Sequence, residues 1–370
     1  MTLPVIKRGD IHDMMHFEQF STDVPTFGAD EPLDAIQNPD VFVTRKMYHG
    51  EFIDLPDGNQ IEVWGFEDPE DDENGLQFPS KMIRIPEGSL FHGKLEARHG
   101  PHTIHWHGIE PMSSSDGVGK LSFEVTGHYT YQWLAAEAGT YFYHCHRNTT
   151  LHFEMGMYGG LIIDPLPPEG ETQLTAPYAT GGPGYVRRGD ELVRYDAERL
   201  WVSDDMDPRW HVLDKDSGIG GFPFDDPRKD PGLNIFHPTY FFISGVPHPW
   251  TVTDSKVVAR VKVGQTLLLR IICAGYAFHR WTIGLDAEVI AMDGRTLGTT
   301  GRSGAHNPYS HPFDLPANSM IELTAARRWD LLIRPTQAGV YPVSCEVHDI
   351  CNEPNGHFGT AQTVIIVDPA

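Results

Sequence analysis

Short stretches rich in β-branched and aromatic residues recur along the chain, and glycine, proline and aspartate bound them. They include "KMIRI", "TYFYH" and "LIID" in the first half, and "VVARVKV", "TLLLRII" and "TVIIV" in the second. Segments of this kind predict β-strands separated by turns. Regular strands with turn signals between them predict an all-β protein made of sandwich or barrel units.

The strand pattern repeats within the chain. When Gly88 is set over Gly264, Gly108 falls on Gly284 without a gap. Further on, "AGTYFYHCH" aligns with "AGVYPVSCE", "GMYG" with "GHFG", and "LIIDP" with "IIVDP". Such self-similarity predicts two copies of one domain. The expected organisation is an irregular N-terminal arm (1–40), a first domain (41–165), a connector rich in proline and glycine (166–197) and a second domain (198–370).

One short stretch of the first domain, "HCHRNTTLHFEMGM", offers several metal donors. The thiolate of Cys145, the imidazole of His152 and the thioether of Met157 are the donor types of a blue (type 1) copper site. A second imidazole is needed, and His102 in "PHTIHWHG" is the candidate. Zinc or an iron–sulfur cluster is disfavoured because no second cysteine lies nearby.

Alternation along a strand sorts the remaining histidines into a second site. Side chains two residues apart share a face of a strand, and neighbours face opposite sides. Cys145 is therefore expected to face one side and its two flanking histidines the other, with His102 on the cysteine side. The second site is predicted to contain His105, His107, His144 and His146.

Composition narrows the possible partners. The chain has 51 acidic and 28 basic residues and a net charge of −23, so nucleic acid and anionic membranes are disfavoured. There is no apolar run of about 18 residues for a membrane helix. The N-terminus lacks the apolar stretch of a secretion signal, which predicts a cytoplasmic location unless a signal was removed. Cys345 is left with Cys351 or Cys273 as alternative disulfide partners.

At "HTIHWHG" and "HCH…H…GM" the sequence resembles the two-domain multicopper oxidases with a blue copper in the first domain. The resemblance implies cupredoxin-like Greek-key domains, a homotrimer, a small reducing substrate and O2 as the electron acceptor. It also implies a three-copper cluster between the first domain of one subunit and the second domain of its neighbour. Electrons are then expected to pass from the blue copper through Cys145 to the second centre.

Copper nitrite reductases share part of this pattern. They are similar at His102, His107, His144 and Cys145. They carry an aspartate where this chain has His105 and no histidine at the place of His146, and these two differences favour the oxidase.

The second domain departs from the oxidase pattern. The repeat alignment places Trp281 and Ile283 where His105 and His107 stand, and Ser344 and Glu346 where the other two cluster histidines stand. Replacement ligands from a neighbouring subunit are expected among Glu346, His348 and His279. Glu346 or Asp349 is the candidate for moving protons.

Several functions remain open at this point. The leading hypothesis is an oxidoreductase with a reorganised second copper centre. The alternatives are nitrite-reductase-like chemistry at one copper, with His348 as the ligand from the neighbouring subunit, and a blue-copper electron carrier without turnover. A partner subunit that supplies the missing histidines is a further alternative.

Overall fold

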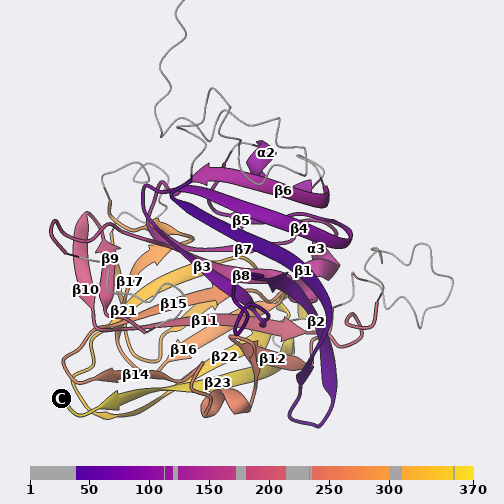
Figure 1. Cartoon of the computed structure of the whole chain (residues 1–370). Coiled ribbons are helices and arrows are strands. Elements are labelled where there is room, and N and C mark those ends of the chain that lie inside the picture. Colours follow the sequence, from indigo (N-terminus) through magenta and orange to yellow (C-terminus); the bar gives the residue numbers. More distant parts are fainter. Residues whose placement is uncertain are drawn as a thin grey trace, which may run out of the picture.

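A computed structural model describes residues 39–111, 113–119, 124–171, 181–213, 233, 236–299, 311–352 and 355–370. Figure 1 shows two β-domains stacked on one another, with the first domain in indigo to magenta and the second in orange to yellow. The fold is all-β with cupredoxin-like domains, as predicted. The predicted arm (1–40) lies almost entirely outside the described residues. No helix in the described part is both long and apolar enough to span a bilayer.

The first domain consists of two four-stranded sheets, with strand orders β2-β1-β4-β6 and β3-β8-β7-β5. Its elements are β1 (Val41–Asp54), β2 (Gln60–Glu67), β3 (Ser80–Pro86), β4 (Leu90–His102), β5 (His105–His107), α2 (Ser113–Asp116), β6 (Val125–Leu134), β7 (Gly139–His144), α3 (Thr149–Glu154) and β8 (Tyr158–Asp164).

The second domain also consists of two sheets. One runs β13-β12-β11-β15-β21-β17-β18, with β19 paired to β17, and the other runs β14-β23-β22-β16-β20. Its elements are β11 (Ala197–Met206), β12 (Tyr240–Ile243), β13 (Val246–Pro247), η4 (Trp250–Val252), β14 (Ala259–Lys262), β15 (Leu267–Cys273), β16 (Phe278–Ile283), β17 (Ala287–Met292), β18 (Arg295–Thr296), β19 (Phe313–Leu315), β20 (Met320–Leu323), β21 (Arg328–Ile333), β22 (Gly339–His348), η5 (Ile350–Asn352) and β23 (His357–Asp368).

The two domains share their strand pairing. In the first, β1 runs parallel to β4 and β3 parallel to β8, while β7 is antiparallel to both β5 and β8. In the second, β11 runs parallel to β15 and β14 parallel to β23, while β22 is antiparallel to both β16 and β23. The internal sequence repeat is therefore a repeat of topology.

The connector contains ordered structure that its composition did not predict. Strands β9 (Gly184–Arg188) and β10 (Glu191–Tyr195) form an antiparallel hairpin. Its apolar side chains Val186 and Tyr195 pack against Leu268, Ile290 and Leu332 of the second domain. The second half of the connector is therefore an extra layer on that domain.

The domains meet through a shared apolar cluster between β3, β7 and β8 on one side and β11 and β15 on the other. The cluster contains Met82, Phe142, Phe153, Tyr158 and Ile162 from the first domain and Leu200, Val202, Ile272 and Ala274 from the second. Burial of these apolar side chains stabilises the contact between the two domains.

A buried ionic network crosses the same interface. Arg84 of β3 forms ion pairs with Asp164 at 2.6 Å and with Glu198 of β11 at 2.7 Å. Arg270 of β15 pairs with Glu198 at 2.7 Å and with Asp330 at 3.0 Å. All five side chains are at most 7% exposed. Burial opposes ionisation of Glu198, but the two guanidinium groups hold its pKa below the usual range.

Candidate metal centres

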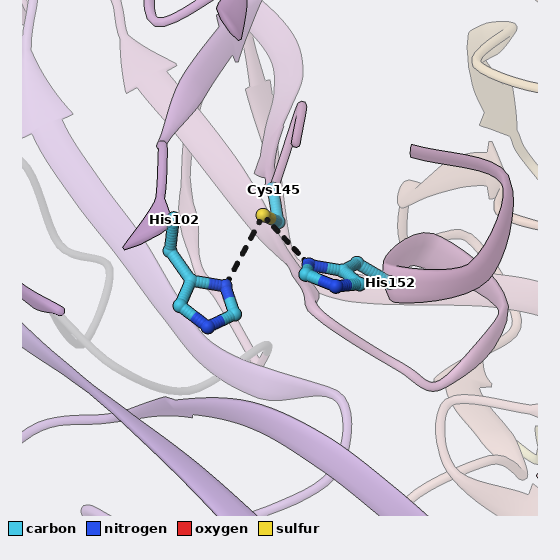
Figure 2. A group of neighbouring side chains, drawn as sticks. All are labelled: His102, Cys145 and His152. Carbon is cyan, nitrogen blue, oxygen red and sulfur yellow. Dashed lines mark hydrogen bonds between the residues drawn. The ribbon is translucent and has the colours of Figure 1, made fainter. Parts of the chain in front are cut away.

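Three predicted ligands of the blue copper converge at one end of the first domain. The Sγ atom of Cys145 lies 3.6 Å from Nδ1 of His102 and 3.4 Å from Nδ1 of His152. Figure 2 shows the sulfur between the two imidazole rings. All three side chains are fully buried. Such a pocket presents one soft and two borderline donors to a single point.

The loop after β7 supplies most of this site, and backbone hydrogen bonds fold it onto itself. Cys145 directly follows β7, His152 is on α3, and Met157 directly precedes β8. The amide of Cys145 donates to the carbonyl of Met157 (3.0 Å), and the amide of Met157 donates to the carbonyl of His152 (3.1 Å). Met157 is fully buried beside these ligands, and its role as the axial ligand stays a prediction.

His102 reaches the site because the chain changes sheets. β4 ends at His102 in one sheet, and β5 begins at His105 in the other. The prediction placed His102 opposite to His105 by counting residues along one continuous strand. The structure gives the same separation for another reason, since the two histidines belong to different sheets.

The residues fit a bound copper. Ligand atoms that share one metal at roughly 2.0–2.3 Å in a trigonal or tetrahedral arrangement lie roughly 3.3–3.8 Å apart. Both sulfur–nitrogen distances fall in this range. Burial raises the pKa of the Cys145 thiol to about 11. Metal binding therefore has to displace the thiol proton.

A second group of ligand atoms comes from His105, His107 and His144, which lie within 4.8 Å of one another. Nδ1 of His105 donates to the carbonyl of Asp116 (2.7 Å), and Nδ1 of His144 donates to the carbonyl of Cys145 (2.9 Å). Because a carbonyl only accepts, each ring keeps its Nε2 lone pair for a metal. Nε2 of His144 lies 3.3 Å from Nδ1 of His107.

Burial favours the neutral form of several of these imidazoles. Burial, with a further contribution from Arg328, lowers the pKa of His107 to about 3. Burial also lowers the pKa of His144 and that of His146. His146 is not part of the tight group of three, but its ring lies 5.3 Å from that of His105. Neutral imidazole is the form that binds a metal, so no proton has to leave these rings first.

The two groups face opposite sides of β7. Tyr143 and Cys145 point into the first-domain core. Phe142 points outward into the interdomain cluster, and its ring stacks on His107 at 4.7 Å and on His144 at 5.2 Å. The peptide that joins His144 to Cys145 therefore links one metal group to the other.

The strand register corrects the alignment of the second domain. Thr282 lies opposite Ser344, as His105 lies opposite His144. Thr282, and not Trp281, therefore occupies the position that corresponds to His105. The sequence alignment was therefore one residue out of register at this strand, although Gly108 over Gly284 lies close by. The conclusion that this position lacks an imidazole is unchanged.

Trp281 and Ile283 are core residues of the second domain. They are 0% and 2% exposed, and Trp281 stacks on Trp201 with ring centroids 5.4 Å apart. Their side chains point into the core, whereas the outward residues of β22 lie on the opposite face of the sheet. The suggestion that they occupy former ligand positions is therefore wrong.

A substitution at Trp281 tests this placement. Trp281→Phe is expected to lower the free energy of unfolding by about 0.5–3 kcal/mol because it removes buried volume. Copper content is expected to stay the same. Arg280→Ala, on the opposite face, removes a partly exposed pair with Glu322 and is expected to cost at most about 1 kcal/mol. Urea unfolding and metal analysis give both quantities, and loss of copper without loss of stability in Trp281→Phe contradicts the placement.

His279 is engaged inside the second domain. It is fully buried, its Nδ1 lies 2.7 Å from the hydroxyl of Ser203, and its Nε2 lies 3.3 Å from Asp205. Both ring nitrogens therefore have oxygen partners within the domain. This placement contradicts the suggestion that His279 binds copper in a neighbouring subunit.

The other second-domain candidates lie near the surface. Glu346 is exposed, and its carboxylate is 3.3 Å from Nε2 of His348. The Asp349 carboxylate accepts hydrogen bonds from the Cys351 amide and from the side chain of Asn352, so it caps a turn. Among the described residues, neither metal group includes Glu346, His348 or Asp349. Their roles as ligands or proton carriers stay predictions.

All four cysteines are described and none forms a disulfide. Cys145, Cys273 and Cys345 are buried, whereas Cys351 is exposed. Neither pairing proposed for Cys345 is present.

Two residues that contact the metal groups were not predicted from the sequence. Asp116 orients His105 through its backbone carbonyl, which carries no residue-specific signal. Trp64 covers His152, with ring centroids 5.6 Å apart, from β2 far upstream. Only the tertiary fold brings these residues to the site.

Comparison with known proteins places these motifs in a family. Residues 77–168 match the multicopper oxidase family model. The chain is 39% identical over 95 residues to copper resistance protein A of Escherichia coli, which covers 25% of this chain and 15% of that protein. Residues 77–168 thus form a multicopper oxidase domain, which confirms the resemblance.

Solved structures extend the likeness to both domains. A blue copper oxidase from Nitrosomonas europaea aligns with a TM-score of 0.59 and 23% identity, covering 88% of this chain and 86% of that one. A copper nitrite reductase from the same organism aligns with a TM-score of 0.56 and 14% identity, covering 89% and 94%. At these identities the likeness establishes the two-domain fold.

Proposed function

We propose that the chain is a copper-dependent oxidoreductase of the multicopper oxidase type, which oxidises a small reducing substrate with O2 as the acceptor. The observation that carries the proposal is the pair of ligand groups on opposite sides of β7, joined by the peptide between His144 and Cys145. Because the match to copper resistance protein A spans 15% of that protein's length, activity and substrate are inferred from the site.

The two ligand groups have different roles in this proposal. Bound copper supplies one-electron redox chemistry at Cys145 and a place for O2 reduction at the histidine group. Cys145, His102 and His152 would hold the first ion in a fully buried pocket, and the buried Met157 would adjust its potential. His105, His107 and His144 present imidazoles at the second group, and burial lowers the pKa of His107 and that of His144. The carbonyls of Asp116 and Cys145 fix the orientation of two of these rings.

The oligomer and location extend this proposal. A homotrimer would bring the second domain of a neighbour toward the histidine group, with Glu346 exposed and His348 beside it. The cytoplasmic location that the N-terminal residues predicted is also part of this proposal. Sedimentation measures the oligomeric state, and fractionation of cells that express the chain measures the location.

Metal counting with electron paramagnetic resonance tests the function. We expect more than one copper per chain, one blue and at least one of another type, together with O2 consumption when a phenol or another reductant is added. His105→Leu is expected to retain the blue signal and to stop O2 consumption. A single non-blue copper with activity toward nitrite supports the nitrite-reductase alternative, and reversible redox cycling of one blue copper without turnover supports an electron carrier.

A further inference from the structure

The second domain holds both ends of the loop that carries the blue-copper ligands. This ligand loop, residues 148–158, contains His152 and Met157 and begins and ends beside strands of the interdomain face. At its start, the hydroxyl of Tyr276 donates to the carbonyls of Thr149 (3.0 Å) and Thr150 (2.9 Å). At its end, the hydroxyl of Tyr158 donates to the carboxyl group of Asp204 in β11.

The Tyr158–Asp204 contact is buried and the Tyr276 contacts are partly buried, and β11 supports both. Asp204 and Asp205 are neighbours on β11 and are 3% and 0% exposed. Asp205 accepts hydrogen bonds from the amides of Tyr276 (2.8 Å) and Ala277 (3.0 Å), which fixes the turn from which the Tyr276 side chain extends. His279 lies 3.3 Å from the same carboxylate. Two adjacent aspartates of one strand therefore anchor both contacts.

Asn148, the N-cap of α3, has φ of 43° and makes no side-chain capping hydrogen bond. The short α3 therefore depends on tertiary contacts, since a helix of this length is not stable alone. The ring of Phe153, beside His152, packs between Tyr158 (5.1 Å) and Tyr276 (5.8 Å). Tyr276 thus contacts the ligand loop through its ring as well as its hydroxyl, and Tyr158 ties the end of the loop to Asp204.

We propose that the second domain is a clamp on the ligand loop, in which Tyr276 and the Tyr158–Asp204 pair are positioning residues for the blue copper. The clamp fixes where His152 and Met157 stand relative to Cys145. The reduction potential of a blue copper depends on its axial ligand and on the hydrogen bonding around it. The second domain, whose described residues form no metal group of their own, thereby controls the site in the other domain.

Two conservative variants test the clamp. Tyr276→Phe and Tyr158→Phe remove one hydroxyl each and keep the ring packing. Both are expected to change the copper hyperfine splitting of the blue site and to shift its reduction potential. Loss of outer contacts typically weakens metal affinity 10- to 100-fold, so we expect a loss of about this size in chelator competition. The double variant is expected to show the largest shift.

Tyr141→Phe is the matched control. Its hydroxyl also crosses the domain interface, to the carbonyl of Gly294 at 2.9 Å, but does not contact the ligand loop. We expect this control to lose stability while the spectrum, potential and copper affinity stay those of the parent. If Tyr276→Phe and Tyr158→Phe behave like Tyr141→Phe, the clamp is refuted.

The clamp rests on the proposed function only because it requires a blue copper at Cys145. Measurements on the unsubstituted parent protein distinguish a failure of the clamp from a failure of the proposed function. A parent that binds no blue copper overturns both proposals. A blue parent whose loop variants are unchanged in spectrum, potential and affinity overturns the clamp alone.

Discussion

Cys145→Ser is expected to abolish the blue colour of the copper-loaded protein while a second copper signal remains. The colour of a blue site depends on the copper–thiolate bond, and a serine hydroxyl does not replace the soft sulfur donor. The second group is held by His105, His107 and His144, whose side chains lie on the other side of β7. Absorption and electron paramagnetic resonance spectra of the loaded variant measure both signals.

The matched control for this variant is Cys351→Ser. Cys351 is exposed and lies in the second domain, outside both metal groups, so the blue colour is expected to persist. Loss of both copper signals in Cys145→Ser is the contrary outcome, because it means that the two groups form one interdependent site.

Arg270→Met is expected to reduce the free energy of unfolding by about 3–5 kcal/mol, since it leaves partners of a buried ion pair uncompensated. Arg270 is 1% exposed and forms ion pairs with Glu198 and Asp330. Because both carboxylates are buried as well, water does not take the place of the lost guanidinium group. Methionine has similar length, so the loss reflects charge and hydrogen bonding more than volume. Chemical denaturation of the metal-free protein measures the change.

Arg260→Met provides the comparison. Arg260 pairs with Asp368 in the same domain, but these side chains are 62% and 42% exposed. Exposed pairs contribute about 0–1 kcal/mol, so the expected loss is small. Equal losses in the two variants contradict the role assigned to the buried network.

Much of the first domain was predictable from sequence because its signals are local. The spacing of Cys145, His152 and Met157 in one short loop keeps the three residues near one another. Strand alternation separates Cys145 from His144 in the same way. The repeat of "AGTYFYHCH" as "AGVYPVSCE" indicated the second domain, and the shared strand pairing agrees with it.

The sequence-based prediction was wrong where contacts between distant parts of the chain determine strand register and side-chain partners. The register of β16 against β22 depends on which residues fill the core, and Trp281 does so. A glycine-anchored alignment does not detect a shift of one residue, yet such a shift reverses every side chain. His279 was similarly misplaced, because its partners Ser203 and Asp205 are over seventy residues away in sequence. The β9–β10 hairpin was missed because glycine and proline dominate the preceding residues.

The apolar cluster shared by β3, β7, β8, β11 and β15 limits how this chain can be divided. A fragment that ends at the first-domain boundary exposes Phe142, Phe153 and Tyr158 to water and leaves Arg84 without Glu198. Such a fragment is prone to self-association through this surface. Gene fusions and truncations that preserve function therefore need to keep both halves on one polypeptide or to supply the missing half in trans.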